Sequence, residues 1–248
     1  MSSDFDISNA GTGPAALAVP LTFHSLDTPG AIHIPPQAAT WDGFRQWATS
    51  DDFPERGKIT FVAGGLVVDT SPESFEEQGA VKAEVSRVLL QLVRDRKLGH
   101  YRIDGTLISN ETAGLSSEPD SVFISSATIK AGRVTFVPEV NRPQSSKEIL
   151  GTVDWVLEII SPSSRRKDSK LLRDAYFAAG IPEYWLIDPT RDYGVDFQIL
   201  IRGDGEYVAV AAERGWLASP TFGCSFRLTR ERDDDGYWQY TLDKRDSP

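Results

Sequence analysis

The spacing of apolar residues along the chain predicts amphipathic helices. Aromatic residues recur three apart within residues 41–47, directly after Thr40, a residue type that caps helices. A longer stripe of valines and leucines, three and four positions apart, runs through residues 74–98 and stops at Gly99. A further stripe of this spacing runs through residues 171–179. We expect each helix to pack its apolar face on a core.

Shorter segments rich in β-branched and aromatic residues predict strands. Residues 58–62 and 66–69 flank Ala63-Gly64-Gly65, where glycine supplies the backbone of a tight hairpin. The other such segments are residues 101–109, 120–125, 152–160, 183–188 and 195–201, followed by a β-rich stretch over residues 206–242. We expect the turn Ala113-Gly114 to join the first two of these segments, and a loop to occupy residues 126–148.

The order of these elements predicts the fold class. Helix, hairpin, helix, strands, helix and strands in succession are typical of an α/β (α+β) protein with a mixed central β-sheet flanked by helices. We divide the chain into three parts. Residues 1–38, rich in Gly, Ala, Ser, Thr and Pro, read as a flexible N-terminal extension; residues 39–205 form the core domain; and residues 206–248 form a β-rich C-terminal extension packed on the core.

Three features of the sequence predict a cytoplasmic protein without a membrane span. The longest apolar runs are far shorter than the roughly 20 residues that a spanning helix needs. The N-terminus opens with Asp4 and Asp6, which does not resemble a secretory signal. A single cysteine, Cys224, excludes an internal disulfide and suits a reducing compartment.

Overall and local charge give opposite indications about a nucleic-acid partner. The formal net charge is −10, whereas phosphate binding draws on a positive field. Residues 165–174, however, carry five cationic side chains against two aspartates. The net charge therefore argues against a general nucleic-acid coat protein, and a local basic face stays open.

Two carboxylates stand where their burial needs an explanation. Glu158 lies in the apolar strand of residues 153–160, where an unpaired charge is costly, so it requires a metal ion, a lysine or a proton. A functional site and a structural salt bridge are both compatible with this position. Asp120 follows Pro119 at the start of another predicted strand, where a turn aspartate is the alternative.

The order and spacing of four stretches resemble a known family. Over about residues 40–205 the chain is similar to the Uma-two family of restriction-endonuclease-like proteins, in the PD-(D/E)XK nuclease superfamily. The stretches are Ser71-Pro72-Glu73; Glu118-Pro119-Asp120; Leu157 to Ser164 with Lys167-Asp168; and Tyr176 with Ala179 to Asp188. The resemblance implies a restriction-endonuclease-like core and metal-dependent hydrolysis of DNA phosphodiester bonds.

The resemblance also implies roles for individual residues. Asp120 and Glu158 correspond to ligands of Mg2+ or Mn2+, with the Ile159 carbonyl as a further ligand, and such oxygen donors suit hard divalent cations. A lysine would orient the attacking water or stabilise the extra charge of the transition state. Lys167 and Lys170 are the two candidates, and Lys167 is preferred because it forms a Lys-Asp pair seen in relatives; a solvated surface lysine is the alternative for either.

Three family positions are altered, which leaves a second hypothesis open. A family glutamate, histidine and lysine correspond to Thr60, Gln78 and Leu172. One hypothesis is therefore an active endonuclease acting on DNA, and the other is a catalytically degenerate module that binds nucleic acid or a protein partner. Because cutting two strands commonly needs two active sites, we also expect a homodimer.

Overall fold

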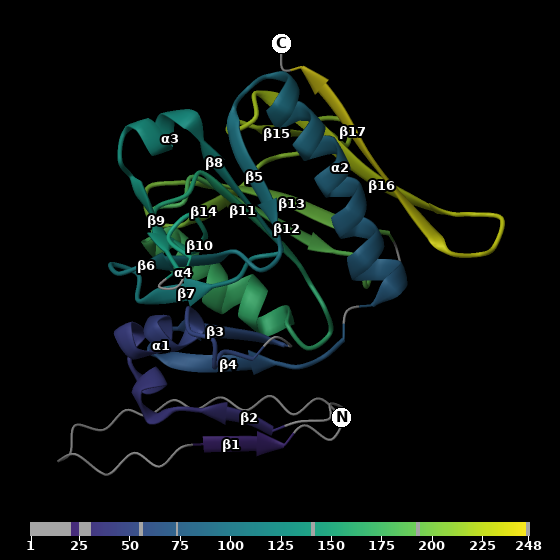
Figure 1. Ribbon diagram of the computed structural model, residues 1–248. Coiled ribbons are helices and arrows are strands. Elements are labelled where there is room, and N and C mark those ends of the chain that lie inside the picture. The colour runs from purple at the N-terminus through teal and green to yellow at the C-terminus, as the bar shows by residue number, and fades with distance from the viewer. Residues whose placement is uncertain are drawn as a thin grey trace.

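Two six-stranded mixed sheets form the centre of the computed structural model, which describes residues 21–24, 31–54, 57–72, 74–139, 142–191 and 194–246 (Figure 1). The first sheet has the order β4 (Gly65–Asp69), β3 (Lys58–Val62), β7 (Leu115–Ser117), β6 (Leu107–Asn110), β10 (Ser146–Gly151), β9 (Val134–Pro138). The second has the order β14 (Tyr207–Ala209), β13 (Asp196–Arg202), β12 (Glu183–Asp188), β11 (Trp155–Ile159), β8 (Ser121–Ser125), β5 (Gly99–Ile103).

Parallel and antiparallel pairs occur in both sheets. The pairs β6 with β10 and β11 with β12 are parallel, and the other neighbours within the two sheets are antiparallel. A smaller antiparallel sheet at the C-terminus contains β15 (Leu217–Ser219), β16 (Cys224–Arg232) and β17 (Trp238–Asp246), and β1 (Leu21–His24) pairs with β2 (Ala31–Ile34). The expected mixed α+β architecture with a β-rich C-terminus is confirmed.

The helices are few and short apart from α2. They are η1 (Pro36–Ala39), α1 (Trp41–Ala48), η2 (Phe75–Gly79), α2 (Ala80–Asp95), α3 (Ser126–Lys130), η3 (Lys167–Leu172) and α4 (Arg173–Ala178). The helices expected from apolar spacing are present, and η2 and η3 add a wider π-helical turn before α2 and α4. Among the residues that the structure describes, no helix has the length and apolar character that crossing a membrane requires.

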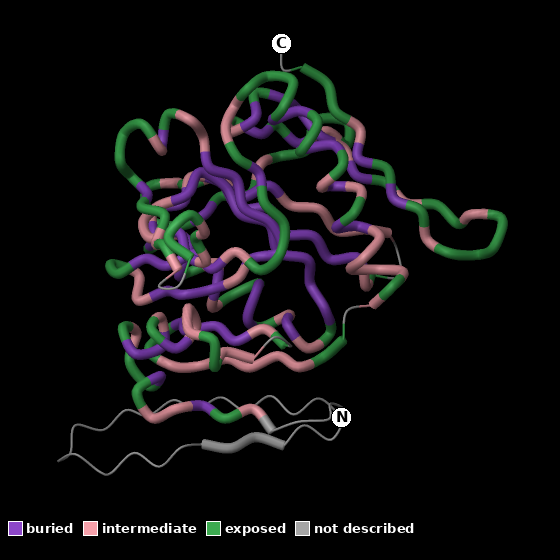
Figure 2. The backbone as a smooth tube through the Cα atoms, in the orientation of Figure 1, coloured by how far each residue is buried: buried purple, intermediate pink, exposed green. Residues whose placement is uncertain are grey.

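The second sheet lies between two apolar cores, and its central strands are buried throughout (Figure 2). On one face, Trp155 and Leu157 pack with α2 and the C-terminal sheet. On the other face, Val156 packs with Tyr176 of α4 and with residues of the first sheet. Because strand side chains alternate between faces, Glu158 shares the face of Val156 and points toward α4.

Three segments differ from the expectation. The segment 101–109 is broken into β5 and β6, which belong to different sheets, because Asp104 and Gly105 adopt positive φ and turn the chain. The Ala113-Gly114 turn joins β6 to β7, not to the strand that begins at Ser121. The expected loop 126–148 was also wrong: Ser125 caps α3, and an antiparallel pair of strands, β9 and β10, follows.

The expected N-terminal extension is described only in part. Residues 1–20 and 25–30 lie outside the described residues, as does Glu73 of the Ser71-Pro72-Glu73 stretch. Within the described part, Ile34 and Ala38 are buried against Phe44 of α1. The end of this segment therefore contributes to a third small core that covers the outer face of β3.

A buried carboxylate fastens the C-terminal sheet to the second sheet. Glu183 at the start of β12 accepts hydrogen bonds from the Ser219 hydroxyl at 2.6 Å, the Thr221 N–H at 3.0 Å and the Trp185 indole. Phe222 packs its ring against Trp185 close by. The β-rich C-terminus is thus packed on the core.

Glu183→Gln is expected to change how stability depends on pH. Burial raises the pKa of Glu183, although its hydrogen bonds oppose the shift. Between the ordinary pKa of a carboxylate and this raised pKa, the folded protein keeps a proton that the unfolded chain releases, so the free energy of unfolding falls as pH rises. Glutamine carries no such proton. The melting temperature of the variant should therefore gain on wild type as pH rises above about pH 4, whereas a constant difference would contradict the raised pKa.

Candidate active site

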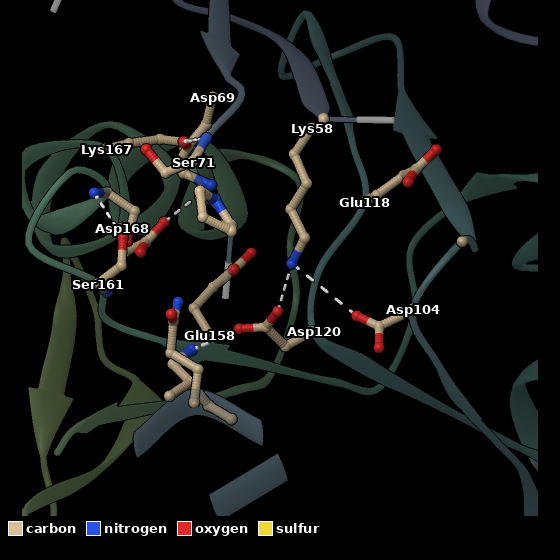
Figure 3. Close-up of a pocket in the computed structure, with 16 residues that line it drawn as sticks. Lys58, Asp69, Ser71, Asp104, Glu118, Asp120, Glu158, Ser161, Lys167 and Asp168 are labelled. Atoms are coloured by element: carbon tan, nitrogen blue, oxygen red, sulfur yellow. Dashed lines mark hydrogen bonds and ion pairs between the residues drawn. The ribbon is translucent and has the colours of Figure 1, made fainter. Parts of the chain in front are cut away.

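A cavity of about 420 Å³ lies at the C-terminal end of β11. It is bordered by the start of β3, the end of β4, the β5–β6 turn, the segment before β8, and the segment from β11 into η3 (Figure 3). Its lining includes six carboxylates and two lysines, namely Asp69, Asp104, Glu118, Asp120, Glu158, Asp168, Lys58 and Lys167. Asp120, Glu158, Ile159 and Lys167, all expected from the sequence, are therefore brought to one cavity.

Asp120 is buried, and both of its carboxylate oxygens have hydrogen-bond partners. Its Oδ2 accepts a hydrogen bond from the Ile159 N–H at 2.7 Å, which joins the start of β8 to the end of β11. Its Oδ1 accepts a hydrogen bond from Lys58 and lies 3.3 Å from the Lys82 ammonium. Burial by itself would raise the pKa of Asp120, but the two lysine charges outweigh burial and lower the pKa. Asp120 is therefore ionised.

Glu158 lies on the neighbouring strand, where nearby positive charges balance its carboxylate less than they balance Asp120. Its Oε1 accepts a hydrogen bond from the Tyr176 hydroxyl at 2.6 Å. Burial raises the pKa of Glu158 to about 8, with Asp168 and Asp120 adding to the rise and Lys167 opposing it. The side chain is 2 % exposed, so its charge is not screened by bulk water. Near neutral pH the Glu158 carboxyl therefore keeps a proton, and its ionised form is favoured only by additional positive charge.

The turn after β11 places the lysine beside these carboxylates. The Ser161 N–H donates to the Ser164 hydroxyl, and the Ser164 N–H donates to the Ser161 hydroxyl, both at 2.9 Å. These reciprocal bonds form a compact turn that leads directly into η3. Lys167, in the first turn of η3, is buried and forms an ion pair with Asp168 at 3.1 Å. The serine stretch therefore positions Lys167 over the end of β11.

Lys170, the other candidate lysine, lies outside this cavity. Its side chain is 71 % exposed and pairs with Asp174 one helical turn later, at 3.6 Å. It is absent from the cavity lining. The structure therefore brings Lys167 to Asp120 and Glu158 and leaves Lys170 at the surface.

The expected basic face of residues 165–173 is largely used within the chain. Arg165 forms an ion pair with Asp188, and Arg173 donates to the Tyr207 carbonyl at 2.7 Å. Lys167 and Lys170 are also paired, as described above. These contacts join η3 and α4 to the ends of β12 and β14. The cationic side chains of this segment are therefore largely engaged in contacts that stabilise the fold.

Sequence reasoning missed two lysines and an aspartate. Lys58 opens β3 and contacts Asp120, while Lys82 of α2 is 9 % exposed at its side chain and contacts both Asp120 and Asp104. One signal was available for Lys82, because it falls at helical spacing with Val85 and therefore on the apolar stripe. Lys58 carried no comparable signal, since its contact with Asp120 joins positions 62 residues apart.

The donor set of the cavity fits a hard divalent cation. Carboxylate oxygens outnumber ammonium groups along the lining, and oxygen donors are the ligands that Mg2+ and Mn2+ prefer. The raised pKa of Glu158 shows that the negative charge there is only partly balanced. Among the described residues, no group of three or more His, Cys, Asp or Glu side chains lies in an arrangement that could hold a metal ion.

Fold and cavity together define a nuclease-like α+β protein. The sequence matches the model of the Uma2 family, described as "Putative restriction endonuclease", over residues 41–231, and the chain belongs to this family. A solved structure of a "putative nuclease" from Anabaena variabilis is similar at a TM-score of 0.54, with 20 % identity over 74 % of this chain and 90 % of that chain. At that identity the likeness shows the fold. No curated protein matches. The resemblance read from the sequence is confirmed.

Proposed function

We propose that this chain is a metal-dependent endonuclease that hydrolyses phosphodiester bonds of DNA. The observation that carries the proposal is the meeting of Asp120, Glu158 and Lys167 in one cavity, from three separate elements. Membership of a family described as restriction endonucleases supports it. Strongly perturbed carboxylates beside a buried lysine are typical of catalytic sites.

The residues of the cavity have distinct proposed roles. Asp120 and Glu158 hold Mg2+ or Mn2+ through their carboxylates, and the Ile159 carbonyl is a further oxygen donor. When bound, the cation supplies Lewis-acid polarisation of a phosphoryl oxygen and lowers the pKa of a water molecule. Lys167 orients the attacking water and stabilises the additional negative charge on the phosphate as the bond breaks. Tyr176 fixes the orientation of Glu158 through its hydroxyl.

Cleavage of supercoiled plasmid by the purified full chain tests this function. We expect nicked and linear products with Mg2+ or Mn2+ and intact plasmid with EDTA. Single-stranded DNA and RNA substrates in the same assay determine which nucleic acid is preferred. Absence of products with every metal and substrate would overturn the proposed activity.

A second function is favoured by a specific contact. Lys58 and Lys82 both lie against Oδ1 of Asp120, the oxygen that a cation would approach. Together with Thr60, Gln78 and Leu172 at altered family positions, this favours a catalytically degenerate module that binds nucleic acid or a protein partner. Retention of DNA in a gel-shift assay without cleavage is the result expected of such a module.

We also propose that the chain acts in the cytoplasm as a homodimer, with the β16–β17 hairpin at the contact. This hairpin projects past α2 (Figure 1), and Tyr237 near its tip stacks edge-on against Phe75 at 6.2 Å between ring centroids. Phe75 is 82 % exposed and Tyr237 is 48 % exposed, so the two rings form a contiguous apolar surface of the kind that contacts a partner.

Phe75→Ser is expected to weaken the dimer by about tenfold, because burying an aromatic side chain is a large apolar contribution to association. The matched control is Val208→Ser, which removes another exposed apolar side chain, 53 % exposed, on the edge strand β14 and away from the hairpin (Figure 1). Sedimentation velocity across a range of concentrations measures both. A wild-type mass of one chain at every concentration contradicts the homodimer.

A further inference from the structure

Three charged side chains from separate elements surround Asp120. Lys58 of β3 approaches both Asp120 and Asp104, which lies in the β5–β6 turn (Figure 3). Lys82 of α2 approaches the same two carboxylates. Lys82 lies 2.9 Å from Asp104 Oδ1 and 3.3 Å from Asp120 Oδ1. Lys58 donates to Asp120 Oδ1 and lies 3.9 Å from Asp104 Oδ1. Two cations thus share two carboxylates.

The backbone at Asp104 is held in an unusual conformation. Asp104 has a φ of +33°, a region that L-residues rarely adopt, although Asp and Asn tolerate it better than most. Its N–H donates to the Asp120 carbonyl at 3.2 Å, and Gly105 continues the turn with a φ of +60°. This conformation directs the Asp104 carboxylate into the cavity, between the two lysines. Backbone conformations of this kind concentrate at functional sites.

A cation at Asp120 would meet both ammonium groups. Oδ2 of Asp120 is occupied by the Ile159 N–H, so Oδ1 is the oxygen toward the lysines. Like charges at this distance repel, so the ammonium groups must move off Oδ1 as a cation arrives. Lys82 is almost fully buried, so its ammonium group requires an acidic partner wherever it lies. An acceptor within reach of both ammonium groups would supply one.

We propose that Asp104 is this acceptor: a positioning residue that takes Lys58 and Lys82 from Asp120 when a divalent cation binds. The inference rests on the proposed function, and it adds a residue that the family motifs do not include. Asp104 already contacts Lys82 closely and needs little movement of Lys58. Its side chain is 46 % exposed, so it can accept an additional hydrogen bond without a new desolvation cost.

Mn2+ binding to the full chain tests this role directly. Asparagine tolerates positive φ and keeps the turn, so Asp104→Asn removes only the charge. We expect the dissociation constant for Mn2+, measured by calorimetry and by electron paramagnetic resonance of the free ion, to rise about tenfold or more. The control is Glu118→Gln, which removes one charge from the same cavity at a residue that Lys58 affects only through space. Its effect should stay below about threefold.

A second pair of variants distinguishes two explanations of weaker Mn2+ binding. One is that Asp104 accepts the lysines that leave Asp120, and the other is that the cavity has lost one negative charge. In a Lys82→Met background the ammonium that Asp104 most closely holds is absent, so Asp104→Asn should weaken Mn2+ binding by less than about threefold. An unchanged tenfold effect in that background would overturn the proposal. So would equal Mn2+ binding by wild type and Asp104→Asn. Absence of Mn2+ binding by wild type would instead overturn the proposed metal-dependent function, and this inference with it.

Discussion

Asp120→Asn is expected to lower metal-dependent DNA cleavage by about a thousandfold, because removal of one group that stabilises developing charge commonly has an effect of this size. Asparagine is neutral and nearly isosteric. It retains an oxygen for the Ile159 N–H, so the link between β8 and β11 is kept. Alanine at this position would also remove the atoms that Lys58 and Lys82 contact, which confuses loss of the ligand with loss of stability.

Two measurements distinguish a missing ligand from a damaged fold. Wild type is expected to gain melting temperature on addition of Mn2+, since a ligand that binds only the folded state stabilises it by about 2.7 kcal/mol at 100 times its dissociation constant. The Asp120→Asn variant should remain folded without this gain, whereas Glu118→Gln should retain it. If Asp120→Asn gains as much as wild type and cuts DNA at the same rate, Asp120 is not a ligand.

The elements read correctly from the sequence are those with a single strong periodicity. The stripe within residues 74–98 leads to α2, which is buried along Val85, Leu89 and Leu92 as its spacing predicts. The strand around Glu158 was equally plain, because apolar residues on both sides imply burial on both faces.

The elements misread depend on backbone conformation and distant pairing. Segment 101–109 keeps its β-forming composition through the break, and only the positive φ of Asp104 and Gly105 divides it between two sheets. Likewise, β10 owes its place to pairing with β6, about 40 residues earlier in the chain, which the polar composition of residues 126–148 does not reveal.

The same distinction holds for the cavity. Glu158 was marked locally by its apolar strand and Asp120 weakly by Pro119, and the family resemblance assigned both as metal ligands. Lys58 lies on a hairpin whose sequence gives no sign of the carboxylate it meets, and the proposed role of Asp104 follows only from the tertiary arrangement of four elements. In the sequence, only the resemblance of the Lys167-Asp168 pair favoured Lys167 over Lys170, because the two lysines lie three residues apart in one helical segment and their burial differs only after packing.

Lys167→Met is expected to lower cleavage by about a hundredfold, in the range found for a positioned group that acts on the reacting proton or charge. Lys170→Met is the matched control, with the same substitution in the same segment, and should leave cleavage within about twofold of wild type because this lysine is exposed. Plasmid cleavage at saturating Mn2+ measures both. Equal losses in the two variants would contradict the assignment of Lys167.

The Lys167→Met variant is also expected to lose stability, and measuring that loss helps to interpret its cleavage rate. Methionine at this position leaves Asp168 without its ion-pair partner in a buried site, which costs about 3–5 kcal/mol in comparable cases. The double variant Lys167→Met with Asp168→Asn removes both charges, so the melting temperature should recover much of the loss. If cleavage recovers together with stability, Lys167 serves only to balance Asp168. If stability recovers and cleavage does not, the Lys167 ammonium itself acts on the water or the phosphate.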